Sequence, residues 1–170
     1  KLLTMIMKKQ GFKVRLLTPR QAGLVVTGSP NDASVNPETY VNLRNLELDP
    51  TEKIIFPGFY GISPSGNIAT FSRGGSDITG AILARGFNAE LYENFTDVDA
   101  IFSANPAIVS HPQPISKMTY REMRELSYAG FSVFHDEALI PAIQAQIPVN
   151  VKNTQHPERP GTMIVPETNF

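Results

Sequence analysis

The sequence predicts an α/β sandwich, in which short strands alternate with helices along the chain. Apolar residues recur at helical spacing in residues 2–9 and 119–128, and at strand spacing in residues 12–17. Glycine and proline stand at the ends of most of these segments. The 170 residues are 41% hydrophobic and 18% charged, which is typical of a folded domain rather than a disordered chain.

The first half of the chain is predicted to hold two helices, three strands and a hairpin. The first helix, residues 2–9, ends at Gly11, and the second begins with Pro37. The expected elements are strands at 12–17, 24–27 and 53–56, a loop at 28–32, a helix at 37–46, and a hairpin of 59–62 with 67–71.

The second half is predicted to continue the alternation. Thr119 and Glu122 have the spacing of a capping box, so a helix is expected to begin there. The expected elements are helices at 78–85, 119–128 and 136–145, strands at 89–93, 100–102 and 148–152, and a polar loop at 94–99. Residues 1–154 are predicted to form the domain, and residues 155–170, rich in Pro, Glu and Thr, a tail or linker.

Composition argues against several function classes. The formal net charge of −1 leaves no basic surplus for a nucleic acid or an anionic membrane, and we expect neither as a partner. The absence of cysteine excludes disulfides and thiolate metal sites and is compatible with a cytoplasmic location. No apolar run approaches the roughly 18 residues of a membrane span. His111, His135 and His156 do not stand at metal-ligand spacing, so no protein metal site is expected.

The segment FSRGGSD, residues 71–77, is the most informative for chemistry. It lies between a predicted strand and a predicted helix, where free N–H groups and glycines favour a bound anion. Arg73 is suited to grip a carboxylate through two hydrogen bonds, and Asp77 to accept from an ammonium. A glycine turn before a helix capped by Ser76 explains the pattern about equally well.

The segment TDVD, residues 96–99, follows a predicted strand. Ligands of open α/β sheets bind beyond the carboxyl ends of strands, so Thr96 and Asp97 are candidates for holding nucleotide hydroxyls or amines. An ordinary Asx turn accounts for the same residues and is favoured by the pattern alone.

Four segments together resemble the aspartokinase branch of the amino acid kinase family, in the order in which that family has them. They are PGFYG (57–61), FSRGGSD (71–77), TDVDAIF (96–102) and IPVNVKN (147–153), the last followed by PGT (160–162). The resemblance covers essentially the whole chain. It implies a three-layer αβα sandwich with a mostly parallel sheet, of which this chain is the C-terminal portion.

The resemblance implies transfer of the γ-phosphoryl group of ATP to the β-carboxylate of L-aspartate, a step that leads to lysine, threonine and methionine. Arg73, Gly74, Gly75, Ser76 and Asp77 then form the substrate segment, with Asp77 also catalytic. The implied nucleotide contacts are Thr96, Asp97, Phe102, Ser132 and Val133, with Phe102 where many members have Tyr. Mg²⁺ is expected to arrive with ATP, and the intact enzyme to be a homo-oligomer.

The sequence departs from the family pattern in two cations. Ala107 stands where many members have Arg, and Ser132 where many have Lys. The family's opening strand, its Lys-Phe-Gly-Gly phosphate loop and its regulatory ACT domains do not appear in residues 1–170. We therefore expect these residues alone to be inactive or nearly so.

Two other functions stay open at this point. One is a related kinase with another substrate, such as glutamate, acetylglutamate or a nucleotide. The other is a non-catalytic module that binds nucleotide or amino acid, or dimerises through the helix of residues 119–128. The neutral Ala107 and Ser132 favour the non-catalytic module.

Overall fold

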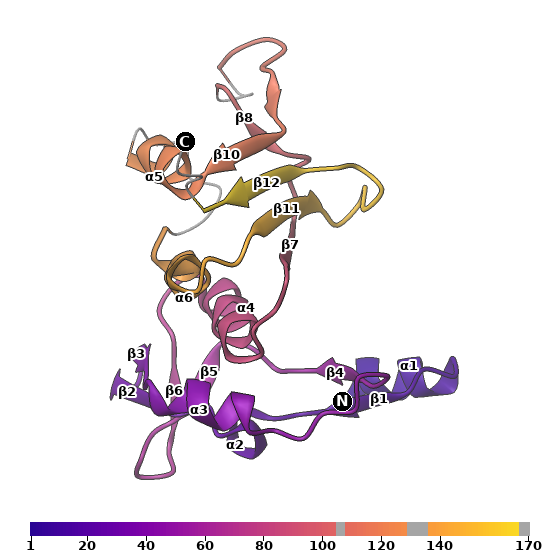
Figure 1. Ribbon diagram of the computed structural model, residues 1–170, viewed down its shortest axis with the longest axis vertical. Coiled ribbons are helices and arrows are strands. Elements are labelled where there is room, and N and C mark those ends of the chain that lie inside the picture. The colour runs from indigo at the N-terminus through magenta and orange to yellow at the C-terminus, as the bar shows by residue number, and fades with distance from the viewer. Residues whose placement is uncertain (105–107, 129–135, 167–170) are drawn as a thin grey trace. The chain divides into compact units, whose positions relative to one another are not determined.

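The computed structural model describes residues 1–104, 108–128 and 136–166 and has two compact units, Lys1–Thr79 and Gly80–Phe170 (Figure 1). Helices and strands alternate in both units, which confirms the predicted α/β class. The helix α4 (Gly75–Gly86) begins in the first unit and continues into the second.

The first unit is built from small two-stranded pairs. Strands β1 and β4 are parallel, and two antiparallel hairpins, β2 with β3 and β5 with β6, complete the pairings. The other elements before α4 are the three helices α1, α2 and α3. The bounds are α1 (Leu2–Lys9), β1 (Val14–Leu16), α2 (Pro19–Ala22), β2 (Val26–Ser29), β3 (Asp32–Val35), α3 (Glu38–Arg44), β4 (Lys53–Ile55), β5 (Tyr60–Ile62) and β6 (Ile68–Thr70).

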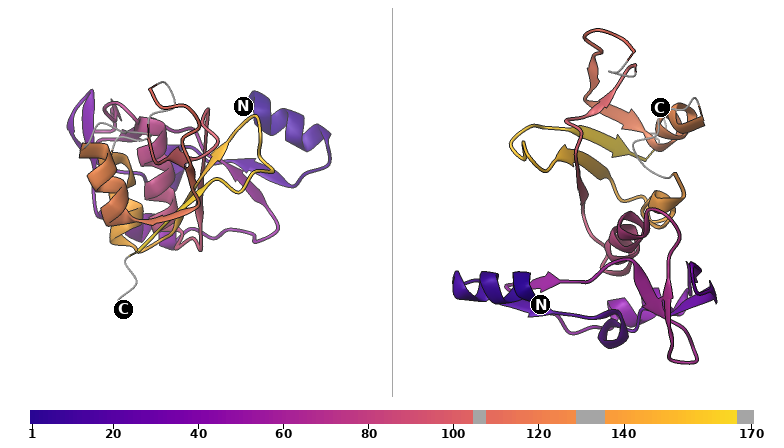
Figure 2. Two further views of the ribbon diagram at one scale, coloured as in Figure 1. Left: turned by 90° about the horizontal axis from the view of Figure 1, so that it is seen from above. Right: turned by 180° about the vertical axis from the view of Figure 1, so that it is seen from behind.

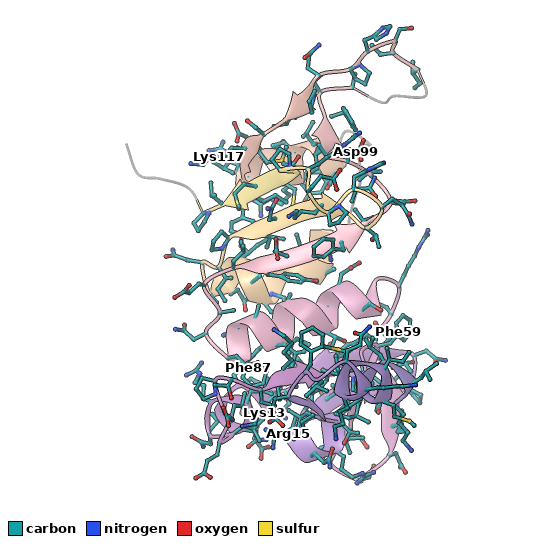
Figure 3. The ribbon with its side chains drawn as sticks, turned by 90° about the vertical axis from the view of Figure 1, so that its right-hand side faces the viewer. Lys13, Arg15, Phe59, Phe87, Asp99 and Lys117 are labelled. Atoms are coloured by element: carbon teal, nitrogen blue, oxygen red, sulfur yellow. The ribbon has the colours of Figure 1, made fainter. Side chains whose placement is uncertain are left out.

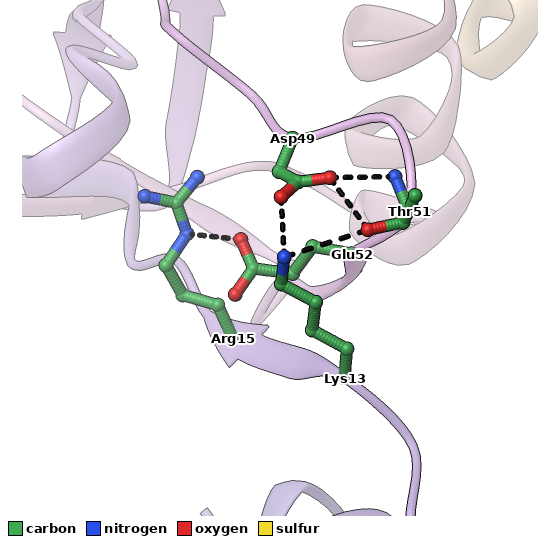
Figure 4. A network of polar contacts seen from close by, with 5 residues as sticks. All are labelled: Lys13, Arg15, Asp49, Thr51 and Glu52. Atoms are coloured by element: carbon green, nitrogen blue, oxygen red, sulfur yellow. Dashed lines mark hydrogen bonds and ion pairs between the residues drawn. The ribbon is translucent and has the colours of Figure 1, made fainter.

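A polar network at the surface ties β1 to the segment before β4 (Figure 4). Lys13 pairs with Asp49, whose other oxygen accepts from Thr51 N at 2.8 Å, and Arg15 Nε lies 3.1 Å from Glu52 Oε2. The hydrogen bond from Lys13, then those from Thr51, hold the pKa of Asp49 well below its usual range. The same pairing with Asp49 raises the pKa of Lys13.

The second unit contains a four-stranded sheet in the order β10-β12-β11-β7. Two of its three pairings are parallel, β10 with β12 and β11 with β7, and β11 with β12 is antiparallel. Strands β8 and β9, which come between β7 and β10 along the chain, form a separate short antiparallel pair. The bounds are β7 (Tyr92–Thr96), β8 (Ile101–Phe102), β9 (Pro114–Ile115), β10 (Lys117–Thr119), α5 (Tyr120–Tyr128), the 3₁₀ helix η1 (Asp136–Leu139), α6 (Ile140–Gln144), β11 (Val149–Asn153) and β12 (Thr162–Val165).

The core of this unit lies between one face of the sheet and helices α4, α5 and α6 (Figure 2). Val149, Val151 and Ile164 alternate along the strands and are fully buried, as the period of two requires. The hydroxyl of Tyr120 donates to the carbonyl oxygen of Ile147, and burial raises the pKa of Tyr120 to about 12.

The capping box predicted at Thr119 and Glu122 is confirmed. Thr119 N donates to Glu122 Oε2 at 2.7 Å, and Glu122 N donates back to Thr119 Oγ1 at 3.2 Å. The Glu122 carboxylate accepts from Thr119 N and also from Thr119 Oγ1, at 3.0 Å, and these two bonds lower its pKa. Thr119 ends β10 and caps α5, so strand and helix meet at one residue.

Several predicted boundaries are wrong. The loop predicted at residues 28–32 is the tip of the β2–β3 hairpin, because its turn residues reverse a chain whose strands continue to either side. The strand predicted at 89–93 runs from Tyr92 to Thr96, so the polar loop predicted at 94–99 begins with strand residues. Asn94 is buried in this strand, and its amide donates to Tyr92 OH at 2.9 Å.

Four elements were not expected from the sequence, namely α2, β9, β10 and β12. The stretch predicted as a tail, residues 155–170, contains β12, whose Thr162 and Ile164 are fully buried. Thr162 Oγ1 donates to Ile115 O at 2.6 Å and accepts from Ile101 N at 2.8 Å, so this stretch joins β8 and β9 to the sheet.

Candidate functional site

The five residues predicted as the substrate segment follow one another where β6 leads into α4. Strand β6 ends at Thr70 and α4 begins at Gly75, three residues earlier than predicted. Ser76 and Asp77 therefore lie in the first helical turn, where backbone N–H groups have no partner within the helix. Arg73 and Ser76 are exposed and Asp77 is half-buried. A guanidinium, an alcohol and a carboxylate thus gather at a helix N-terminus, the polarity that favours a bound anion.

A second segment, around Phe59, packs against this helix start (Figure 3). A Cβ on Gly75 would lie 2.8 Å from Cδ2 of the Phe59 ring, so only glycine leaves room for the ring there. Phe59 is 45% exposed, although its side chain is apolar. Its backbone φ of 81° is uncommon for a residue with a side chain. The wall beside the glycine segment is therefore an aromatic ring, and the residue that carries it has an unfavourable backbone conformation.

Hydrogen bonds hold Phe59 in this conformation from two sides. Phe59 N donates to Thr79 Oγ1 at 2.9 Å, and Phe71 N donates to Phe59 O at 2.9 Å. Thr79 and Phe71 are each 3% exposed, so both partners are firmly placed.

The predicted nucleotide segment lies at the carboxyl ends of two parallel strands of the second unit. Thr96 ends β7 and is in register with Asn153, which ends β11. Thr154 continues the pairing, because its N and its Oγ1 donate to Thr96 O at 2.8 and 3.0 Å. Asp97 follows as an exposed carboxylate, and Thr96 Oγ1 donates to its Oδ1 at 3.2 Å. Adjacent carboxyl ends of parallel strands are the usual ligand position of open α/β sheets.

Asp99 fastens the segment that follows β7 (Figure 3). Asn153 Nδ2 donates to Asp99 Oδ1 at 2.7 Å, and the Arg159 guanidinium pairs with Asp99 Oδ2. The other side of the Asn153 amide accepts from Gln155 N at 2.7 Å. The segment after β7 and the connection from β11 to β12, which are far apart in sequence, are thus joined through one carboxylate and one amide.

Of the remaining residues predicted to contact the nucleotide, the structure describes only Phe102. Phe102 lies in β8, half-buried and paired with Pro114. Ser132 and Val133 lie outside the described residues, as does Ala107. The structure thus groups Arg73–Asp77 in the first unit and Thr96, Asp97 and Phe102 in the second.

Five residues that hold these segments in place were not predicted as site residues. They are Phe59 and Thr79 in the first unit, and Asp99, Asn153 and Arg159 in the second. Phe59, Asp99 and Asn153 do lie in segments noted for their family resemblance. Local spacing gives no sign of the hydrogen bonds, because the partners are 20 to 60 residues apart.

Two features are absent from the described residues. No group of three or more His, Cys, Asp or Glu side chains is placed to hold a metal ion among residues 1–104, 108–128 and 136–166. In the same ranges no helix has the length and apolar character needed to cross a membrane.

A separate hollow of about 470 Å³ lies on β10 and α5. Met118 and Leu126 form part of its apolar floor, and Lys117, Arg121 and Glu125 lie around it. None of the predicted site residues lines it.

Several known proteins resemble this chain in sequence and in fold. Residues 1–153 match the amino acid kinase family. Aspartokinase 3 of Bacillus subtilis is 58% identical over 165 residues, which are 97% of this chain and 36% of that protein. The crystal structure of Clostridium acetobutylicum aspartate kinase is 39% identical with a TM-score of 0.76, covering 98% of this chain and 36% of that one. E. coli aspartokinase III in complex with aspartate and ADP is 28% identical with a TM-score of 0.87, covering 99% and 38%.

The chain spans a little more than a third of the length of these relatives. The similarity extends over nearly all of residues 1–170 and therefore includes both candidate segments.

Proposed function

The chain belongs to the amino acid kinase family, and on that premise we propose that the protein carrying it transfers the γ-phosphoryl group of ATP to the β-carboxylate of L-aspartate. The observation that carries this proposal is the segment Arg73–Asp77 at the start of α4, in a chain 58% identical to an aspartokinase. The product is 4-phospho-L-aspartate, an acyl phosphate. The reaction joins a carboxylate oxygen to the γ-phosphorus and breaks the bond between that phosphorus and the oxygen of ADP.

In this proposal the first unit binds the amino acid. Aspartate carries two carboxylates and one ammonium. Arg73 binds one carboxylate through paired hydrogen bonds, and Asp77 accepts from the ammonium. Ser76 and the free N–H groups of the helix start add donors, while Gly74 and Gly75 keep the backbone clear of side chains. The exposed Phe59 ring closes one side of the segment.

The second unit binds the nucleotide in the same proposal. Thr96 and Asp97 stand where two parallel strands end, and their hydroxyl and carboxylate suit the hydroxyl and amine groups of ATP. Phe102, Ser132 and Val133 are proposed as further contacts. Phosphoryl transfer depends mainly on positioning and on neutralising charge, so the order of the loops around Asp99 matters for the reaction.

We assign Mg²⁺ to the nucleotide rather than to a protein cage. The described residues offer isolated carboxylates such as Asp97 and no cluster of three metal-binding side chains. This donor set fits an ion that keeps most of its ligands from phosphate and water. Bound in this way, Mg²⁺ would neutralise phosphate charge during the transfer.

The wider setting follows from the proposed activity. The product is the first intermediate on the route to lysine, threonine and methionine, which implies a cytoplasmic enzyme of amino-acid biosynthesis. Its partners are then L-aspartate and ATP, and the intact enzyme is a homo-oligomer.

The reaction can be tested with hydroxylamine, which traps an acyl phosphate as a hydroxamate. The complete protein that carries residues 1–170 is incubated with Mg-ATP and either L-aspartate or L-glutamate. We expect hydroxamate with aspartate only. The variant Asp77→Ala is expected to lose at least about 100-fold in kcat/KM, as for a lost charge-assisted contact in the transition state.

Asp32→Ala is the matched control, because Asp32 is an exposed carboxylate on β3 of the same unit. It is expected to keep full activity. Hydroxamate with glutamate instead would indicate a kinase for another amino acid. A folded protein without hydroxamate formation would favour the non-catalytic module.

A further inference from the structure

We propose that Thr79 is a positioning residue, whose hydroxyl fixes the Phe59 loop to the first turn of α4 and so shapes the amino-acid site. The inference rests on the proposed function for its kinetic consequence, but its geometric part stands on hydrogen bonds within the first unit. Thr79 itself is 3% exposed and is not placed to touch a substrate.

One hydroxyl makes both connections. Thr79 Oγ1 donates to Gly75 O at 2.7 Å and accepts from Phe59 N at 2.9 Å. A threonine hydroxyl has one proton to donate and lone pairs to accept with, so the two bonds are compatible. The carbonyl that it binds belongs to the glycine on which the Phe59 ring packs.

The two hydrogen bonds of the Thr79 hydroxyl differ in kind. A threonine that bonds to the carbonyl four residues earlier occurs often in helices. The bond from a loop amide to the same hydroxyl is a tertiary contact, since Phe59 lies 20 residues before Thr79. In the part of the chain that the structure describes, Thr79 Oγ1 is the partner recorded for Phe59 N.

The Phe59 loop needs such a tie because its conformation is unfavourable in itself. A non-glycine residue with φ near 81° is uncommon. Phe71 N holds the carbonyl side of Phe59, and Thr79 holds the amide side. Without the hydroxyl, the amide loses its buried partner and the residue is freer to return to negative φ. The ring would then leave Gly75, and the wall of the site would move.

The Phe59 loop packs closely against the start of α4. A Cβ on Gly58 would lie 3.5 Å from both Cβ and Oγ1 of Thr79 and 3.6 Å from Cα of Ser76. The loop therefore touches the helix turn that carries the substrate segment. A displacement here reaches Ser76 directly, whereas Thr96 and Asp97 belong to the other unit.

The test compares Thr79→Val, which removes the hydroxyl at nearly constant shape, with Thr79→Ser, which keeps it. Both are made in the complete protein that carries residues 1–170. Hydrogen exchange followed by mass spectrometry is measured on the peptide containing Phe59. Exchange is expected to be about fivefold faster in Thr79→Val, as the loss of one hydrogen bond implies, and close to wild type in Thr79→Ser.

Kinetics supply a second readout that simple destabilisation does not reproduce. In Thr79→Val the KM for L-aspartate is expected to rise about tenfold, as for a shift of the substrate wall, while the KM for ATP stays within about twofold. Thr79→Ser is expected to restore the aspartate KM. Should Thr79→Val fail to fold, Thr79→Ala removes the hydroxyl without placing a methyl group against the Phe59 amide.

The outcomes separate this inference from the proposed function. Unchanged exchange at Phe59 in Thr79→Val overturns the inference, whatever the enzyme does. Equal defects in the serine and valine variants also overturn it, because a variant that keeps the hydroxyl would then hold the Phe59 loop no better than one that lacks it. If the wild-type protein has no aspartate activity, the proposed function fails, and the exchange measurement alone decides the role of Thr79.

Discussion

The two candidate segments are held in place in different ways. The segment in the first unit depends on the absence of a side chain at Gly75, because the Phe59 ring occupies the position that such a side chain would take. The segment in the second unit depends on polar pairing, because Asp99 joins Asn153 and Arg159 around the ends of two strands. One segment is therefore sensitive to added atoms and the other to removed ones.

The difference follows from the elements that carry each segment. A strand that leads into a helix through two glycines brings backbone close to a ligand, at the cost of tight turns. Two parallel strands that end side by side bring polar side chains together without strain. The first arrangement suits a small amino acid that must be enclosed. The second suits a larger nucleotide that lies across strand ends.

The largest expected effect tests whether a glycine that leaves no room for a side chain is important only in the first unit. Gly161, before β12, has φ of 70°, and a Cβ there would lie 2.0 Å from the carbonyl oxygen of Val151. Because that contact is with backbone, Gly161→Ala is expected to destabilise the protein by at least about 3 kcal/mol in denaturant unfolding.

Gly66→Ala is the matched control for this variant. Gly66 also has a positive φ, 84°, but nothing lies within 4 Å of the added Cβ. It should cost only about 1 kcal/mol, the penalty of the conformation itself. Equal losses in the two variants would show that the Val151 contact has no energetic weight.

The next effect tests the polar pairing of the second unit. Asp99→Ala leaves the Asn153 amide and the Arg159 guanidinium without their shared carboxylate. We expect the KM for ATP to rise about fivefold to tenfold, since one or two charge-assisted hydrogen bonds are lost, and the KM for L-aspartate to stay unchanged.

Glu158→Ala is the control, because Glu158 is an exposed carboxylate next to Arg159 whose recorded pairing is with His156 at 3.6 Å. It is expected to leave both constants unchanged. A rise in the aspartate constant in Asp99→Ala would contradict the separate roles of the two segments.

A smaller effect concerns the capping box at the start of α5. Thr119→Ala removes the oxygen that accepts from Glu122 N and should lower the unfolding free energy by about 1 kcal/mol. Thr119→Ser keeps that oxygen and should recover most of the loss. If serine and alanine prove equally destabilising, the β-branched shape of Thr119 in β10 is the important feature instead.

The smallest effect is a pH dependence at the surface of the first unit. Pairing with Lys13 depresses the pKa of Asp49 below the ordinary value of 3.8, so its stabilising contribution is present above that pH and is lost as the pH falls towards the depressed value. The pKa of Lys13 is raised, so its contribution is present below 10.5 and is lost as the pH rises beyond the raised value.

Asp49→Asn should therefore weaken the acid dependence of stability below about pH 4, measured by thermal unfolding across a pH series. Asp32→Asn, which removes another exposed carboxylate of the same unit, serves as the control. An identical acid profile in wild type and Asp49→Asn would show that this surface pair does not affect stability, as many do not.

Sequence alone placed most elements and missed those that depend on distant partners. The capping box at Thr119 and the hairpin around residues 63–66 are local signals, and both are confirmed. Strand β12 lies among residues whose Pro, Glu and Thr content suggests a linker, yet it pairs with β10 and β11. Short strands of this kind are stabilised by their neighbours rather than by their own sequence.

The candidate site shows the same division. Arg73–Asp77 could be identified because glycines, a cation and an anion follow one another in a recognisable order. The structural roles of Thr79 and Asp99 could not be predicted, because they depend on contacts with Phe59 and Arg159, 20 and 60 residues away. The segment TDVD was noted for its polar residues, but its local pattern does not reveal that Asp99 pairs with Arg159.

The most direct test of the account is to measure both Michaelis constants in two single variants, Arg73→Gln and Asp97→Asn, of the complete protein that carries residues 1–170. The account predicts that Arg73→Gln raises the KM for L-aspartate about tenfold or more and leaves that for ATP unchanged. Asp97→Asn should do the reverse. If both variants raise the same constant, or neither raises any, the assignment of amino acid to the first unit and nucleotide to the second is wrong.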